Sequence, residues 1–123
     1  MPRDPRQEFG RRAEKEAANY LRKKGHRILE RNYRTPLGEI DLITEWNKTI
    51  VFVEVKAGKY SADFSPVEHL DSRKRNKLLL LGEAYLSAFS EEKNARFDLV
   101  SITENEGGLR VDHFEDVIQD AFL

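Results

Sequence analysis

The fold of this chain is decided by the stretch Gly38-Glu39-Ile40-Asp41-Leu42-Ile43, which is followed after a polar turn by Val51-Phe52-Val53-Glu54-Val55-Lys56. Both segments are rich in β-branched residues, as strands are, and Asn47-Lys48 lies between them as a short turn. The sequence therefore predicts a β-hairpin. Each strand also carries ionisable residues inside its apolar run, and burying charge there is costly unless a partner compensates for it.

The length of the turn determines which hairpin residues oppose one another. With Asn47-Lys48 at the centre of a symmetric hairpin, the numbers of opposed residues add up to 95, so Asp41 faces Glu54 and Glu39 faces Lys56. Opposed residues project to the same face with Cβ atoms about 4.5–5.5 Å apart. Alternation then places all four side chains in one patch, which a slip of one residue would break up.

Such a patch creates an electrostatic problem that a metal ion would solve. Two carboxylates about 5 Å apart repel each other by about 3 kcal/mol at an effective dielectric constant near 20, so one is protonated or a cation lies between them. The oxygens of Asp41 and Glu54, a backbone carbonyl such as that of Val55, and several waters suit Mg²⁺. Lys56 reaches the same patch, where its amine would orient or deprotonate an attacking water. The alternative is an exposed, salt-bridged sheet face.

The remaining segments alternate helical and extended patterns around this hairpin. Asp4-Pro5 predicts a helix start and Gly25 its end, while Ser65-Pro66-Val67-Glu68 has the form of a capping box that opens a second helical region. A polar loop over 57–64 precedes that box. The other predicted segments are strands over 27–34, 39–46, 49–56, 96–103 and 109–114, a helical region that continues to Phe89, and room for a short closing helix over 117–122.

The predicted order αβββαββ belongs to an α/β fold. Because hairpin-connected strands run antiparallel, the central sheet is expected to be mixed, with helices flanking it. A length of 123 residues predicts one domain over 1–123, and the absence of cysteine excludes disulfides and thiolate metal sites. The sequence shows no apolar run long enough to cross a membrane and no apolar signal core, so we expect a cytoplasmic protein.

Positive charge is concentrated in the first third of the chain. Residues 1–35 carry eleven Lys and Arg against five Asp and Glu, whereas the net charge of the whole chain is -1. This asymmetry predicts a one-sided electrostatic footprint for a polyanion, although a solvated helix face would give the same counts. A second basic cluster, Arg73-Lys74-Arg75 with Lys77, starts the second helical region.

The combination of Asp41 with Glu54-Val55-Lys56 on the next strand resembles the PD-(D/E)xK nuclease signature, with Ile40 at the place of the proline. The wider pattern resembles the YraN-like bacterial family of predicted endonucleases, related to archaeal Holliday-junction resolvases. This resemblance extends over roughly residues 8–102. The matching positions include Gly10, Glu14, Ala17, Tyr20-Leu21, Gly25, Arg31-Asn32, Arg34, the two hairpin strands, Phe64, Pro66, Lys74, Tyr85-Leu86 and Arg96-Phe97-Asp98.

The resemblance implies a restriction-endonuclease-like fold and cleavage of DNA phosphodiesters that depends on Mg²⁺ or Mn²⁺. Asp41 and Glu54 would be metal ligands, Lys56 the catalytic lysine, and Glu14 the additional acidic residue on the first helix. The sequence alone leaves Glu14 equally compatible with an exposed helix glutamate paired with a base. Ala13 stands where the family has glycine, and Ala57-Gly58-Lys59 replaces a segment with an arginine, so Lys59 is expected to take over a phosphate contact.

Nucleic acid would bind beside this site. Its phosphates would be contacted by Arg11, Arg34, Lys59, Arg73, Lys74 and Lys77. The leading hypothesis is an endonuclease for branched or structured DNA, and a homodimer is expected by analogy with resolvases. The alternative hypothesis is a nucleic-acid-binding module of nuclease fold that is inactive or depends on a partner such as a branch-migration helicase. A third hypothesis is an interaction domain with a solvated acidic face.

Overall fold

The computed structural model describes residues 4–59, 70–119 and 121. In this part of the chain the elements follow the predicted order αβββαββ. They are α1 (Pro5–Lys23), β1 (Arg27–Thr35), β2 (Gly38–Trp46), β3 (Thr49–Lys59), α2 (Ser72–Leu86), β4 (Asn94–Asn105) and β5 (Gly108–Phe114).

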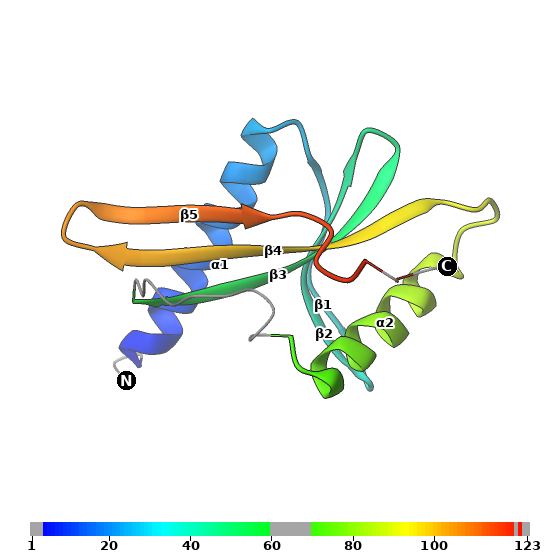
Figure 1. Cartoon of the computed structure of the whole chain (residues 1–123), viewed down its shortest axis with the longest axis horizontal. Coiled ribbons are helices and arrows are strands. Elements are labelled where there is room, and N and C mark those ends of the chain that lie inside the picture. Colours follow the sequence, from blue (N-terminus) through cyan, green and yellow to red (C-terminus); the bar gives the residue numbers. More distant parts are fainter. Residues whose placement is uncertain (1–3, 60–69, 120, 122–123) are drawn as a thin grey trace.

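The strands form one mixed sheet in the spatial order β1-β2-β3-β4-β5 (Figure 1). Three neighbouring pairs are antiparallel, and β3 runs parallel to β4 after the crossover through α2. The predicted mixed α/β sheet is thus confirmed, and its architecture is consistent with a restriction-endonuclease-like fold. The parallel pair places β3, which carries Glu54 and Lys56, in the interior of the sheet.

The central hairpin has the predicted register. Trp46 pairs with Thr49 and Leu42 with Val53, so the numbers of opposed residues add up to 95 as expected. Asn47 and Lys48 have φ angles of 50° and 62°. Two consecutive positive φ angles are the signature of a type I′ turn, whose twist matches that of the flanking strands.

The two helices cover opposite faces of the sheet. The face of α1 that carries Ala13, Ala17 and Leu21 packs against sheet residues including Val53 and Val100. On the other face, α2 contributes Leu78 and Leu81 to a cluster that includes Ile43, Phe52 and Phe97. These two apolar cores hold both helices against the sheet, and burial at about 25 cal/mol per Å² of apolar surface is the main term that stabilises the arrangement.

Two local features define the tip of the β1–β2 hairpin, which lies beside α2. Thr35 pairs with Gly38 across the tight turn at Pro36-Leu37. Gly38 has a φ of +146°, which side chains with a Cβ rarely adopt, and a Cβ placed there would lie 3.5 Å from Leu81 Cδ1. That distance is an ordinary van der Waals contact, so glycine is required here by the backbone conformation, and the first residues of β2 lie beside α2.

The structure corrects three boundaries. Strand β3 continues through Ala57 and Gly58 to Lys59, where the sequence predicted a loop, because pairing with β4 continues to the Lys59–Glu104 pair. The predicted capping box at 65–68 lies outside the described residues, and α2 begins at Ser72 with Asp71 as its N-cap. Residues 117–119 and 121 form bends and turns, with 120 and 122 outside the described part.

The start of α1 was predicted correctly. Asp4 is the N-cap and its side chain accepts a hydrogen bond from the Arg6 N–H, with Pro5 in the first turn. Neither helix in the described part of the chain is long and apolar enough to cross a membrane.

Candidate metal and nucleic-acid site

The candidate site lies where the central hairpin opens. The ladder between β2 and β3 ends at the Leu42–Val53 pair. The expected pairs Asp41–Glu54 and Glu39–Lys56 are therefore not formed. Instead, Asp41 Oδ2 accepts a hydrogen bond of 2.8 Å from the Val55 N–H. The carboxylate replaces a backbone acceptor at the point where β2 and β3 separate, while β3 stays paired with β4 along its whole length.

Three carboxylates converge at this opening. Glu14 from α1 and Glu39 and Asp41 from β2 each offer one oxygen, and these oxygens lie within 4.8 Å of one another. Glu14 and Asp41 are half-buried and Glu39 is exposed. The sequence placed Glu39 in the acidic patch without giving it a ligand role. The structure adds it to the group of acidic side chains close enough to share one cation.

Two residues of β1 hold the cluster from the side. With its amide nitrogen facing the carboxylates, Asn32 donates to Glu14 Oε2 at 3.1 Å and to Glu39 Oε1 at 3.2 Å. Arg34 Nε donates to Glu39 Oε2 at 3.0 Å. Asn32 has a φ of 49°, a conformation that asparagine adopts more readily than most residues. Asn32 matched the family pattern in the sequence but received no role, although an asparagine inside a strand is unusual and was a signal for one.

The acidic cluster disfavours negative charge on its members. Burial and the nearby charge of Glu54 raise the pKa of Asp41 from 3.8 to about 7, against the lowering effect of the Val55 hydrogen bond. Burial also raises the pKa of Glu14, in part offset by the hydrogen bond from Asn32. Both effects follow from crowding carboxylates in a half-buried place, and a bound divalent cation would reverse them.

Glu54 lies near enough to Asp41 to raise its pKa, and a lysine pairs with it. Its Oε1 lies 2.8 Å from Lys74 Nζ, and the two side chains are 16% and 36% exposed. Lys74 belongs to the first turn of α2, where its N–H donates to Asp71 Oδ1 at 2.9 Å. The N-cap therefore fixes the backbone of Lys74 beside β3, and the ion pair links α2 to the sheet.

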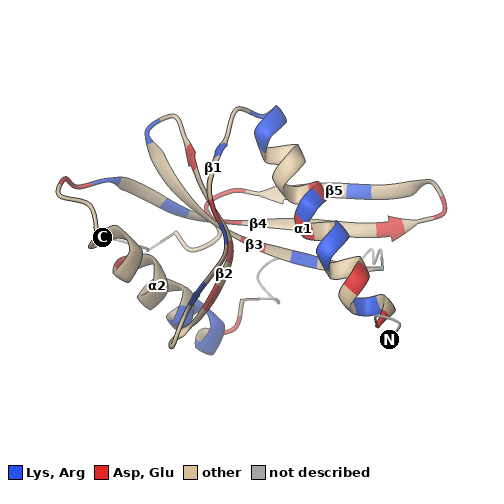
Figure 2. Ribbon diagram, turned by 180° about the vertical axis from the view of Figure 1, so that it is seen from behind, with Lys and Arg blue, Asp and Glu red and all other residues tan. Residues whose placement is uncertain are grey.

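These residues line a cleft of about 420 Å³ between the β1–β2 hairpin tip and the start of α2. Its lining residues are Gly38, Glu39, Asp41, Glu54, Asp71, Arg73, Lys74, Lys77, Leu78 and Leu81. Figure 2 shows the basic first turns of α2 beside the acidic stretch of β2. The cleft thus combines an acidic floor with a basic wall, and both signs of charge are needed to bind a metal ion and a phosphate together.

The remaining predicted residues lie at different distances from this cleft. Lys56 is half-buried and lies two residues beyond Glu54 on β3, outside the set that lines the cleft. Arg11 is exposed and lies on α1 three residues before Glu14. The Lys59 side chain lies outside the described part of the structure. Of the predicted phosphate contacts, Arg73, Lys74 and Lys77 line the cleft, and Arg34 binds Glu39 at its edge.

The donor set suits a hard divalent cation. The oxygens of Asp41, Glu14 and Glu39 are close together, and Glu54 is near enough for its charge to raise the pKa of Asp41. Carboxylate oxygens without histidine or thiolate favour Mg²⁺ or Mn²⁺ over Zn²⁺. The residues present therefore fit the cation that the sequence predicts.

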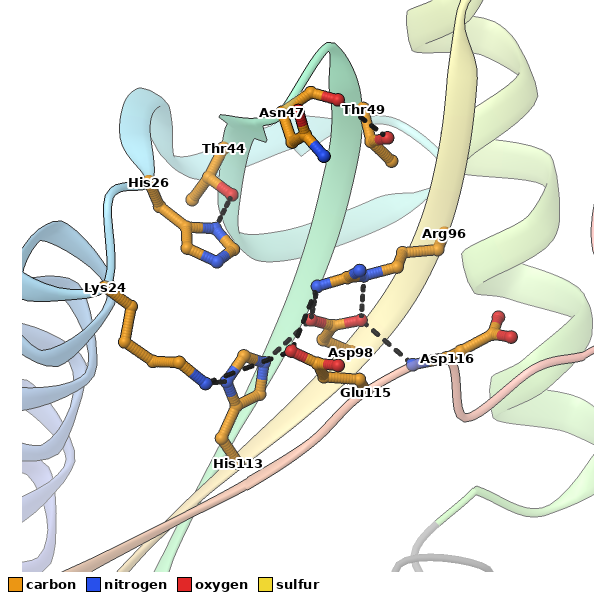
Figure 3. Close-up of polar contacts among 10 residues, drawn as sticks. All are labelled: Lys24, His26, Thr44, Asn47, Thr49, Arg96, Asp98, His113, Glu115 and Asp116. Atoms are coloured by element: carbon orange, nitrogen blue, oxygen red, sulfur yellow. Dashed lines mark hydrogen bonds and ion pairs between the residues drawn. The ribbon is translucent and has the colours of Figure 1, made fainter.

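A second buried carboxylate, Asp98, has very different surroundings (Figure 3). It accepts hydrogen bonds from His113 Nε2 at 2.7 Å, from Arg96 Nε at 3.0 Å and from the Asp116 N–H at 3.0 Å. Burial alone would raise the pKa of Asp98, but these donors hold it below its ordinary value. Each carboxylate oxygen is satisfied within the protein, so this network ties β4 to β5 and the segment that follows.

The chain is similar to one family of known proteins over most of its length. The model of the family described as "Uncharacterised protein family UPF0102" matches residues 13–102. A UPF0102 protein of Thermotoga maritima is 43% identical over 105 residues, which cover 85% of this chain and 92% of that protein. A UPF0102 protein of Nitratidesulfovibrio vulgaris strain Hildenborough is 39% identical over 114 residues, covering 92% and 85%. The solved structure of Pyrococcus furiosus SfsA in complex with Ca²⁺ is 16% identical with a TM-score of 0.36, covering 89% of this chain and 63% of that one.

Proposed function

We propose that this chain, which belongs to the uncharacterised protein family UPF0102, is a metal-dependent endonuclease of the PD-(D/E)xK type that hydrolyses phosphodiester bonds in DNA. The observation that carries the proposal is the cleft itself. Its lining joins Glu39 and Asp41, which together with Glu14 have carboxylate oxygens within 4.8 Å of one another, to a basic helix start. An exposed structural salt bridge would need neither the crowding nor the burial of Asp41.

Asp41 is the central ligand in this proposal, because the charges of Glu54, Glu14 and Glu39 all act on it. The carbonyl of Val55 would complete the set together with water. A bound Mg²⁺ or Mn²⁺ would lower the pKa of a coordinated water and stabilise charge on the phosphate oxygens. The cation would also keep Asp41 ionised at neutral pH, where the protein without it holds the pKa of Asp41 near 7.

The other residues bind and orient. Lys56, two positions after Glu54, would orient or deprotonate the attacking water. Arg73 and Lys77 on the cleft wall would bind DNA phosphates. Further contacts along the DNA backbone would come from Arg34, Lys74, Lys59 and Arg11. Such contacts carry no sequence information, so selectivity would come from DNA shape and affinity would fall steeply with salt. Branched DNA is the proposed substrate. A homodimer would supply the active site for the second strand, and a branch-migration helicase would be a partner that supplies motor activity.

The proposal is tested on a panel of duplex, flap, splayed and four-way DNA with Mg²⁺ or Mn²⁺. Wild type is expected to nick at least one substrate, and Asp41→Asn and Glu54→Gln to lower the rate about 100-fold or more, because each removes charge that stabilises the transition state. Asp112→Asn is the matched control, since Asp112 pairs with Arg110 outside the cleft.

Metal binding is checked separately by melting temperature. Ligands that bind only the native state raise it, so Mg²⁺ or Mn²⁺ should stabilise wild type and Asp112→Asn but not Asp41→Asn. Equal nicking by all variants would indicate a contaminant and defeat the proposal. Salt-sensitive DNA binding without cleavage would instead support a binding module that depends on a partner.

A further inference from the structure

We propose that Lys74 acts as a stand-in cation that neutralises Glu54 until a metal ion displaces it, and that the released Lys74 then binds the substrate phosphate. This inference rests on the proposed function, because it assumes that the carboxylate cluster takes up a divalent cation. It gives Lys74 a second role besides phosphate contact, which is to neutralise Glu54 in the metal-free protein. The switch between the two roles couples metal binding to DNA binding.

The first step of the argument is the geometry of the ion pair. Lys74 Nζ lies 2.8 Å from Glu54 Oε1, on the carboxylate that the proposed metal would share with Asp41. The ammonium and a divalent ion cannot both bind this carboxylate at full strength, since the two cations would repel each other across a few ångströms. Metal binding should therefore break or weaken the Lys74–Glu54 contact.

The second step is the place to which Lys74 is released. Its backbone stays fixed because its N–H donates to the N-cap Asp71 at 2.9 Å. Its side chain is 36% exposed and borders the same cleft as Arg73 and Lys77. A freed ammonium on this wall would join those two cations, so the cleft would become more attractive to a phosphate only after the metal has bound.

The third step is why the protein needs such a cation. Three other carboxylates, Glu14, Glu39 and Asp41, gather beside Glu54, and Arg34 binds the outermost of them, Glu39. Without a cation on Glu54, the free protein would hold a fourth charge against this cluster. Lys74 thus offsets the charge of Glu54 in the metal-free protein and lowers the affinity for metal, and this coupling must act in both directions.

The test measures metal affinity without DNA, by titration calorimetry of Mn²⁺ into wild type, Lys74→Met, Lys74→Arg and Lys77→Met. Breaking a partly exposed ion pair is a small effect, so Lys74→Met should bind Mn²⁺ about two- to tenfold more tightly than wild type. Lys74→Arg keeps the ion pair and should stay near wild type. Lys77→Met removes the same charge from the same cleft wall and should change the affinity less than Lys74→Met.

A second measurement follows duplex DNA binding by fluorescence anisotropy with and without Ca²⁺. Addition of the metal should tighten DNA binding by wild type, and this gain should shrink in Lys74→Met. If Lys74→Met binds Mn²⁺ no more tightly than Lys77→Met, the stand-in role is wrong while the metal site survives. If wild type binds no Mn²⁺ at all, both the stand-in role and the proposed function fail.

Discussion

Asp41 on β2 and Asp98 on β4 are aspartates of the same sheet, yet the charges that surround them have opposite signs. Asp98 is 1% exposed and its oxygens accept hydrogen bonds from an arginine, a histidine and a backbone N–H. Asp41 has one backbone donor, Val55, and three acidic neighbours. As a result the pKa of Asp98 is lowered and that of Asp41 is raised to about 7.

The contrast teaches how to separate a structural carboxylate from a functional one. Burial is unfavourable for the charged form of both, so burial alone does not distinguish them. What differs is compensation, because donors within the protein satisfy Asp98 whereas Asp41 is surrounded by further negative charge. In the described part of the chain, Lys74 and Arg34 compensate only Glu54 and Glu39 in the metal-free site, so Asp41 itself keeps no cationic partner, whereas both oxygens of Asp98 are paired.

The largest effect that this comparison predicts is on Asp98. Asp98→Asn removes the charge that pairs with Arg96, whose side chain is 17% exposed, and replaces one acceptor of the His113 and Arg96 hydrogen bonds by a donor. Breaking a buried pair on one side costs about 3–5 kcal/mol in the free energy of unfolding, measured by urea denaturation. Asp112→Asn breaks the exposed pair with Arg110 at the same spacing and should cost about 0–1 kcal/mol. Equal losses would refute the contrast.

The second prediction has the opposite sign. Asp41→Asn removes a carboxylate that its neighbours disfavour while an amide oxygen can still accept from Val55 N–H. At pH 8 without metal we expect the variant to be more stable than wild type by about 1–3 kcal/mol, since each unit of pKa shift corresponds to about 1.4 kcal/mol before solvent screening. A loss of stability at pH 8 would show that Asp41 is compensated after all.

The pH dependence sharpens the same point. The pKa of Asp41 is raised on folding from 3.8 to about 7, so the native state binds more protons between these values and the stabilising contribution of protonated Asp41 is lost as pH rises through 7. The advantage of Asp41→Asn should therefore shrink as pH falls from 8 towards 4. Paired urea titrations at each pH cancel other groups, among them His26, whose pKa burial lowers to about 4. A constant difference would contradict the raised pKa.

The smallest effect concerns the residue that holds the cluster. Asn32 has a φ of 49°, which alanine adopts less readily because its side chain makes no local hydrogen bond. Asn32→Ala should therefore lower the free energy of unfolding by about 1 kcal/mol. Asn32→Gly removes the same amide without backbone strain. If both variants lose the same stability, the amide contacts with Glu14 and Glu39 matter and the backbone conformation does not.

Much of the fold was predictable from the sequence because it depends on local patterns. The turn Asn47-Lys48 set the register of the central hairpin, and Asp4-Pro5 set the start of α1. Periodicity placed each strand within a few residues. The end of β3 was missed, since Ala57-Gly58-Lys59 has no apolar alternation and remains a strand only because β4 runs beside it.

The candidate site was predictable only in part. Sequence alone determined that Glu39, Asp41, Glu54 and Lys56 come from adjacent strands, because turn length and alternation are properties of neighbouring residues. Tertiary structure decided that the β2–β3 ladder ends at the Leu42–Val53 pair. It also decided that Asn32 and Glu14 reach the opening and that Lys74 binds Glu54. These contacts join residues far apart in the chain, and their geometry is set by the packing of α1 and α2 on the sheet, which no local pattern encodes.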